Sequence, residues 1–254
     1  MSKLEDFEKL TLIERQQKTL SAYLDGELAS HFLSKDYIEG VCTQRNTLHA
    51  TQAKIGTKLL AITAALAFFD HLSGRSISVF TVTLTIEPFL ASILCLMAAS
   101  AFYAAVTSMI DVMLIDAYLR TIGQSAGLFS FDLYTLNKTT VNLWSSAIVP
   151  KYFGPISGKS HHRVLNILHG CMVVLMAAYF VFPTTIISYI AVSFLTDPRS
   201  SFTEWFLVVF ALFLLVISWF FALSFVIKHR FYTADFSEAT GKPTEEFLSR
   251  QAKQ

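Results

Sequence analysis

Long runs of apolar residues alternate with polar segments along this chain, and their lengths predict transmembrane helices. Crossing a hydrocarbon core of about 30 Å takes about 20 apolar residues at a rise of about 1.5 Å each. Residues 88–110 and 205–227 contain no charged side chain and predict two crossings. Residues 164–195 are uncharged apart from His169, and they predict a third crossing as one helix bent at Pro183.

A fourth crossing is predicted before these three, over residues 55–72. Its apolar part, LLAITAALAFF, is short, so the crossing also needs the residues on either side. Lys58 is able to extend its ammonium group to the lipid headgroups while its alkyl chain stays in the membrane. The predicted fold class is therefore an all-α membrane protein with four transmembrane helices, at residues 55–72, 88–120 (including a cytoplasmic extension), 164–196 and 205–227.

Lysine and arginine lie mostly on one side of these four helices. Short loops rich in these residues stay in the cytoplasm, which predicts both termini there, in a bacterial inner membrane. The predicted outer loops, residues 73–87 and 197–204, hold one arginine each. The predicted cytoplasmic parts are an arm at residues 1–54, a loop at 121–163 and a tail at 228–254.

Composition agrees with a membrane protein and excludes several other classes. Hydrophobic side chains make up 53% of the chain and charged ones only 15%, which is too apolar for an ordinary soluble domain. A net charge of +1 gives no reason to expect nucleic-acid binding. The three cysteines fall in the arm and in two predicted spans, so they imply no disulfide framework.

The arm is predicted to form amphipathic helices. Ser2 and Glu5 fit a capping box, Gly40 is expected to interrupt the helical pattern, and from Val41 a helix should run into the first span as a stalk. The apolar faces must be buried on the middle loop, on a partner or on a second copy, and self-association is favoured. The apolar stripe consists of Leu4, Phe7 and Leu10, then Leu20, Tyr23, Leu24 and Leu28.

The first outer loop has a different pattern from the rest of the chain. Its residues 76–86, SISVFTVTLTI, alternate between apolar and hydroxyl side chains, which predicts a β-strand. A strand there would pair within the chain or with a neighbouring subunit. An extended segment lying along the membrane interface is the alternative. In the middle loop, the stretch LWSSAIVPKYFGPI is expected to lie on the membrane surface or under the helices.

Three ionisable side chains are candidates for a polar cluster near the cytoplasmic face of the membrane. Asp111 lies about 34 Å along the helix from Pro88, so it falls near the headgroups, and Asp116 lies beyond it. Salt bridges to Arg120 or to the basic loop are favoured over a transport site. His169, near the start of the third span, is a candidate partner of either carboxylate.

No catalytic or metal-binding pattern is found, so the sequence predicts neither an enzyme nor a cofactor. His162 and His169 are seven residues apart on one helix, too far for one metal ion. The cluster His161, His162 and Arg163 is instead predicted to contact anionic lipid headgroups. Serine-hydrolase, zinc-protease, P-loop and intramembrane-protease motifs are absent from the sequence.

Small residues along the second predicted span indicate close helix packing. Large apolar side chains dominate the fourth span, which is expected to face lipid, whereas the second is expected to face protein. The predicted tight interface consists of Ala98, Ala101, Ala105 and Ser108, which recur at three- and four-residue spacing.

These observations predict a homo-oligomeric membrane protein that acts as a channel-like or membrane-perturbing component. The architecture is similar, in topology only, to that of small multi-span membrane effectors encoded in prokaryotic anti-phage operons, and this resemblance implies a role in antiviral defence. The alternative is a non-conducting membrane anchor or sensor that docks a soluble cytoplasmic partner. A transporter subunit coupled to ions or protons is the third hypothesis.

Overall fold

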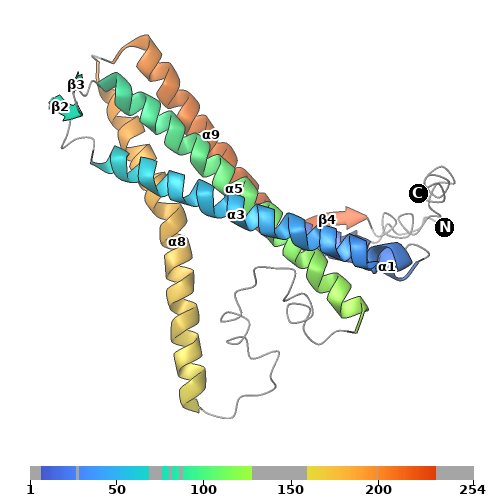
Figure 1. Ribbon diagram of the computed structural model, residues 1–254. Helices are drawn as coiled ribbons and strands as arrows, with labels where there is room; N and C mark the ends of the chain where they lie inside the picture. The colour runs from blue at the N-terminus through green and yellow to red at the C-terminus, as the bar shows by residue number, and fades with distance from the viewer. Residues whose placement is uncertain are drawn as a thin grey trace. The chain divides into compact units, whose positions relative to one another are not determined.

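The computed structural model describes residues 7–26, 29–68, 76–79, 82–85, 88–127, 159–198 and 200–232. Most of these residues lie in helices, and the elements follow the order β1, α1, α2, α3, β2, β3, α5, α8, α9, β4 (Figure 1). The chain divides into two compact units. Unit 1 consists of Met1–His49, Ile110–Gly154 and Leu223–Gln254, and unit 2 of Ala50–Met109 and Pro155–Ala222.

Three helices are long and apolar enough to cross a membrane, which indicates an integral membrane protein. The apolar segments are Phe89–Ser125 in α5 (Pro88–Ser125), Ala177–Thr196 in α8 (Lys159–Thr196) and Phe202–Val226, which is all of α9. The helix α5 begins at Pro88, and α8 continues through Pro183 as one helix, both as predicted. The first predicted span, residues 55–72, is not among the three. The helix that contains its first part ends at Ala67, and residues 69–72 lie outside the described part of the chain.

The predicted stalk is the helix α3 (Lys35–Ala67), which runs without a break toward the first predicted span. The expected interruption at Gly40 was wrong, because α3 begins five residues earlier and passes through this glycine. The hydroxyl oxygen of Ser34 accepts the backbone N–H of Tyr37 at 3.3 Å and so satisfies one free donor of the first turn. A single glycine costs a helix only about 1 kcal/mol, which a helix of this length tolerates.

The start of the arm is a strand rather than the predicted helix. Strand β1 (Phe7–Leu10) pairs antiparallel with β4 (His229–Tyr232), with Phe7 opposite Tyr232 and Leu10 opposite His229. A strand partner distant in the sequence overrides the local helical spacing of Phe7 and Leu10. The predicted capping residues Ser2 and Glu5 lie outside the described residues.

The first helix of the arm, α1 (Leu12–Leu24), starts at a capping box that was not predicted. The Thr11 hydroxyl accepts the N–H of Glu14 at 3.2 Å, and the Thr11 N–H donates to the Glu14 carboxylate at 2.7 Å. The bond from the Thr11 N–H, assisted by the nearby Lys228, lowers the pKa of Glu14. This carboxylate, 3.7 Å from the Lys228 ammonium, therefore joins the arm to the segment after α9.

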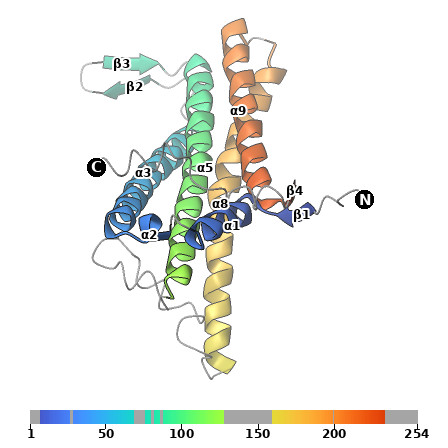
Figure 2. The same ribbon diagram turned by 90° about the vertical axis from the view of Figure 1, so that its right-hand side faces the viewer.

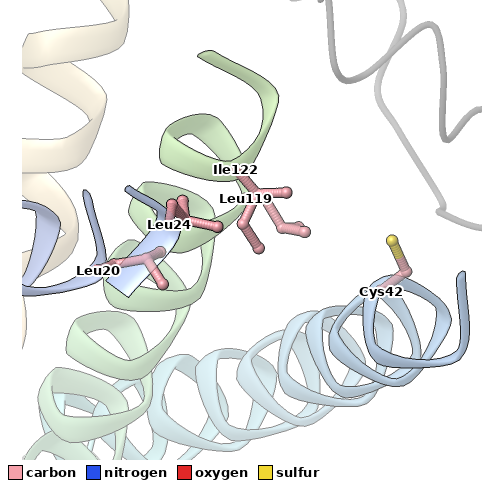
Figure 3. Packing of buried hydrophobic residues seen from close by; sticks show 5 residues of the cluster. All are labelled: Leu20, Leu24, Cys42, Leu119 and Ile122. Carbon is pink, nitrogen blue, oxygen red and sulfur yellow. The ribbon is translucent and has the colours of Figure 1, made fainter. Parts of the chain in front are cut away.

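The core of unit 1 lies between α1, α3 and α5, next to the short helix α2 (Ala29–Phe32). Figure 3 shows Leu20 and Leu24 of α1 directed toward Leu119 and Ile122 of α5, with Cys42 contributed by α3. All five are buried. Leu20 and Leu24 of the predicted apolar stripe are thus covered by helices of the same chain. Self-association of the arm stays a prediction.

The predicted strand between the first two spans is confirmed, and its partner lies within the chain. Strands β2 (Ser76–Val79) and β3 (Val82–Thr85) form an antiparallel hairpin (Figure 2). The register sets Ser76 opposite Thr85 and Val79 opposite Val82. The prediction of a single strand missed this division into two strands, although the alternation changes phase at Val79 and Phe80, which are both apolar.

Unit 2 contains two specific contacts between helices. Gly56 of α3 approaches Tyr179 of α8 so closely that a Cβ atom at this glycine would lie 2.7 Å from the tyrosine oxygen. The Trp219 indole N–H of α9 donates to the Thr184 hydroxyl of α8 at 3.2 Å. The Phe102 ring of α5 packs against the same tryptophan, with ring centroids 6.2 Å apart. These contacts tie all four long helices together within unit 2.

Candidate functional site

A groove opens in unit 1 between α3 and α5. Its volume is about 740 Å³, within the range of ligand-binding clefts. From α3 it is lined by Asp36, Tyr37, Gly40, Val41, Gln44 and Leu48, and from α5 by Asp111, Leu114, Ile115 and Tyr118.

The lining combines apolar walls with two carboxylates. Val41, Leu114 and Ile115 are half-buried, whereas Asp36 and Asp111 are exposed. Neither carboxylate forms an ion pair or hydrogen bond with any other described residue. Among the described residues, both carboxylates are thus exposed and without a cationic partner.

The groove also presents two phenol rings. Tyr37 and Tyr118 pack against the core of unit 1 with their rings and line the groove at the same time. Burial raises the pKa of Tyr37, and so does the neighbouring Tyr118. The Tyr37 hydroxyl consequently stays protonated at neutral pH and is a hydrogen-bond donor.

The other predicted carboxylate, Asp116, has a structural partner. Its Oδ1 atom accepts a hydrogen bond from Nε of Arg45 at 2.6 Å, with 25% of the Asp116 side chain and 14% of the Arg45 side chain exposed. This contact supports the structural interpretation of Asp116, but the partner comes from α3 rather than from Arg120 or the loop. Asp111 belongs to unit 1, with the groove.

We expect the Arg45–Asp116 pair to contribute about 1–2 kcal/mol of coupling energy, more than an exposed pair, because both side chains are mostly buried. A double-mutant cycle with Arg45→Met and Asp116→Asn measures this coupling through urea unfolding of the protein in nanodiscs. The exposed pair Lys35–Glu39, 3.9 Å apart, is the control and should give about 0.5 kcal/mol or less. Equal coupling in the two cycles would contradict the structural role.

Several predicted residues stay untested. The backbones of His161, His162, Arg163 and His169 lie in α8, but their side chains are outside the described part of the structure, as is the middle loop at residues 128–158. The headgroup patch and the pairing of His169 with Asp111 or Asp116 therefore stay predictions. Among the described residues, no three His, Cys, Asp or Glu side chains are grouped so that they could hold a metal ion.

The predicted small-residue interface of α5 is largely covered by the same chain. Ala98, Ala105 and Ser108 are buried in unit 2, and Ala101 is half-buried. In its most apolar stretch, 44% of α5 is buried within the chain, against 22% for the corresponding stretches of α8 and α9. A contact between subunits at this face stays a prediction.

The sequence singled out Asp111 but not the rest of the groove. Asp36, Tyr37 and Tyr118 carry no recognisable motif, and they form a site only because α3 and α5 meet in unit 1. Comparison with models of known protein families, with curated proteins and with solved structures finds no match.

Proposed function

We propose that this protein is a membrane anchor or sensor that docks a soluble cytoplasmic protein in the groove of unit 1. One observation carries the proposal: all the described lining residues belong to α3 or α5, and both helices continue from unit 1 into unit 2. A partner seated in the groove would act directly on two helices that enter the membrane. The partner would thereby be held at the membrane, and its binding would be transmitted to the spans through α3 and α5.

The proposed topology has four crossings. The pairing of β1 with β4 supports this topology, because paired strands lie on one side of a membrane and an even number of crossings would then separate them. The Arg45–Asp116 contact imposes the same condition on the chain between these two residues. Because α5 is apolar enough to cross there, the C-terminal half of α3 supplies the second crossing.

The side on which unit 1 lies follows from the basic residues. Lysine and arginine are concentrated in the segments that belong to unit 1, whereas the segment between α8 and α9 and the segment that carries the hairpin hold one arginine each. By the positive-inside rule this supports a cytoplasmic unit 1 in a bacterial inner membrane.

A pull-down of the full-length protein from native membranes tests the docking. We expect a soluble protein to be recovered in stoichiometric amount, and its recovery to fall about tenfold or more with Ile115→Arg, because a charge in an apolar contact costs more than 1.4 kcal/mol. Met113→Arg is the matched control, since Met113 lies on the same helix, is 39% exposed and does not line the groove. It should leave recovery unchanged.

Two outcomes would count against docking. One is that native membranes yield no stoichiometric soluble protein. The other is that Ile115→Arg and Met113→Arg recover equal amounts while hydrogen exchange shows unit 1 intact in both. The anchor also requires that the purified protein in liposomes conduct no ions.

The homo-oligomeric, channel-like function, with the defence role that its topology implies, is the second candidate. Its support comes from two buried hydroxyls of unit 2, Thr63 and Ser108, which lack a hydrogen-bond partner among the described residues. Orphan polar groups inside a membrane bundle are satisfied by water or by ions when these enter. Conductance in liposomes that changes with Thr63→Val and Ser108→Ala would favour the channel over the anchor.

A further inference from the structure

We infer that the groove of unit 1 takes a basic amphipathic helix, and that this helix is the segment by which the soluble partner docks. The inference rests on the proposed function and narrows it to one class of ligand. Its evidence is the charge of the groove, the spacing of its carboxylates and the apolar lining between them.

The charge of the lining is negative. Among the described lining residues, those ionised at neutral pH are the carboxylates of Asp36 and Asp111, and none is a lysine or an arginine. The guanidinium of the neighbouring Arg45 is held by Asp116. A ligand that carries positive charge is therefore complementary, and an acidic one is repelled.

The two carboxylates lie toward opposite ends of the groove. Asp36 precedes Tyr37, which packs in the same cluster as Tyr118. Asp111 comes seven residues before Tyr118, about 10 Å away along α5. The lining residues of α3, from Asp36 to Leu48, extend over about 18 Å. At such a separation the two carboxylates cannot share one metal ion, whose ligands lie within about 2–3 Å of it.

Apolar side chains line the groove between the two carboxylates along α3 and α5. Val41, Leu114 and Ile115 form this middle section. An amphipathic helix places apolar residues at three- and four-residue intervals along one face, which suits a groove between two helices. Cations flanking this face, about seven to eleven residues apart, would reach the two carboxylates, because this spacing corresponds to roughly 10–16 Å of helix.

The test uses the full-length protein in nanodiscs of zwitterionic lipid, so that a basic peptide does not bind the bilayer through charge. The probe is a synthetic amphipathic peptide with two lysines nine residues apart and leucines on the face between them. Two further probes are the same peptide with glutamate in place of lysine, and spermidine, a trication without an apolar face. Empty nanodiscs give the background.

We expect only the basic peptide to bind. Asp36→Asn and Asp111→Asn should each weaken it about two- to fivefold and the double variant about tenfold, with smaller effects at high salt. Asp25→Asn is the matched control, because Asp25 is an exposed carboxylate of unit 1 that does not line the groove. It should leave binding unchanged.

The inference is overturned if the acidic peptide binds as well, if the double variant binds like the wild type, or if spermidine binds and the peptide does not. If the peptide does not bind but a soluble partner is recovered in a way that depends on Ile115, the inference fails and the proposed docking stands. Binding of the peptide with no such partner in native membranes would instead count against the docking function alone.

Discussion

Replacing Ile122 with alanine is expected to lower the free energy of unfolding of unit 1 by about 3 kcal/mol. Ile122 is fully buried, at 0% exposure, where α1 meets α5 (Figure 3). The substitution removes apolar contacts with Leu20 and Leu24 and leaves a cavity. Because these contacts hold the arm to α5, the arm should detach more readily while the apolar helices of unit 2 stay folded.

Hydrogen exchange of the α1 amides in nanodiscs measures this effect, and protection should fall by roughly two orders of magnitude. Met113→Ala is the control, since it shortens a side chain of the same helix that is 39% exposed. In the control variant, the protection of the α1 amides should change by less than about threefold. If both variants lost protection equally, the packing of α1 on α5 would be refuted.

Gly56→Ala is expected to destabilise unit 2 by about 1–3 kcal/mol through overpacking. The sign of this stability change is informative, because replacing a helical glycine with alanine ordinarily stabilises a helix by about 1 kcal/mol. Here the new methyl group would lie 2.7 Å from the Tyr179 oxygen, closer than van der Waals contact allows. Thermal unfolding of the protein in detergent measures the change.

The second substitution Tyr179→Phe should restore most of the lost stability. Without the hydroxyl, the nearest atom to the new methyl group is the ring carbon Cζ at 3.6 Å, an ordinary contact. Gly170→Ala is the matched control in α8, because a Cβ atom there meets no other atom within 4 Å. If Gly56→Ala is destabilised and Tyr179→Phe does not restore the stability, the contact with the Tyr179 hydroxyl is not the cause.

The helices were the most predictable part of this fold. Apolar runs long enough to cross a membrane need no knowledge of their partners, and the stalk followed from its helical periodicity. The strand β1 was missed because Phe7 and Leu10 also suit a helical stripe. Its true partner, β4, lies more than 200 residues away, and no local pattern encodes that pairing.

The candidate site was predictable only in part. Asp111 stood out because a carboxylate at the end of an apolar run is rare. The rest of the groove depends on which faces of α3 and α5 meet, and that is decided by the packing of Tyr37 and Tyr118 on the core. In the same way, the partner of Asp116 is Arg45, which lies 71 positions earlier in the chain. No local sequence pattern links the two residues.

The β1–β4 pairing also sets the order of events during synthesis. Strand β4 is made more than 200 residues after β1. At about 5–20 residues per second, the early strand waits roughly 10–45 s for its partner. Strand β1 therefore acquires its partner only after α9 has been made, so the β1–β4 sheet is among the last contacts of unit 1 to form.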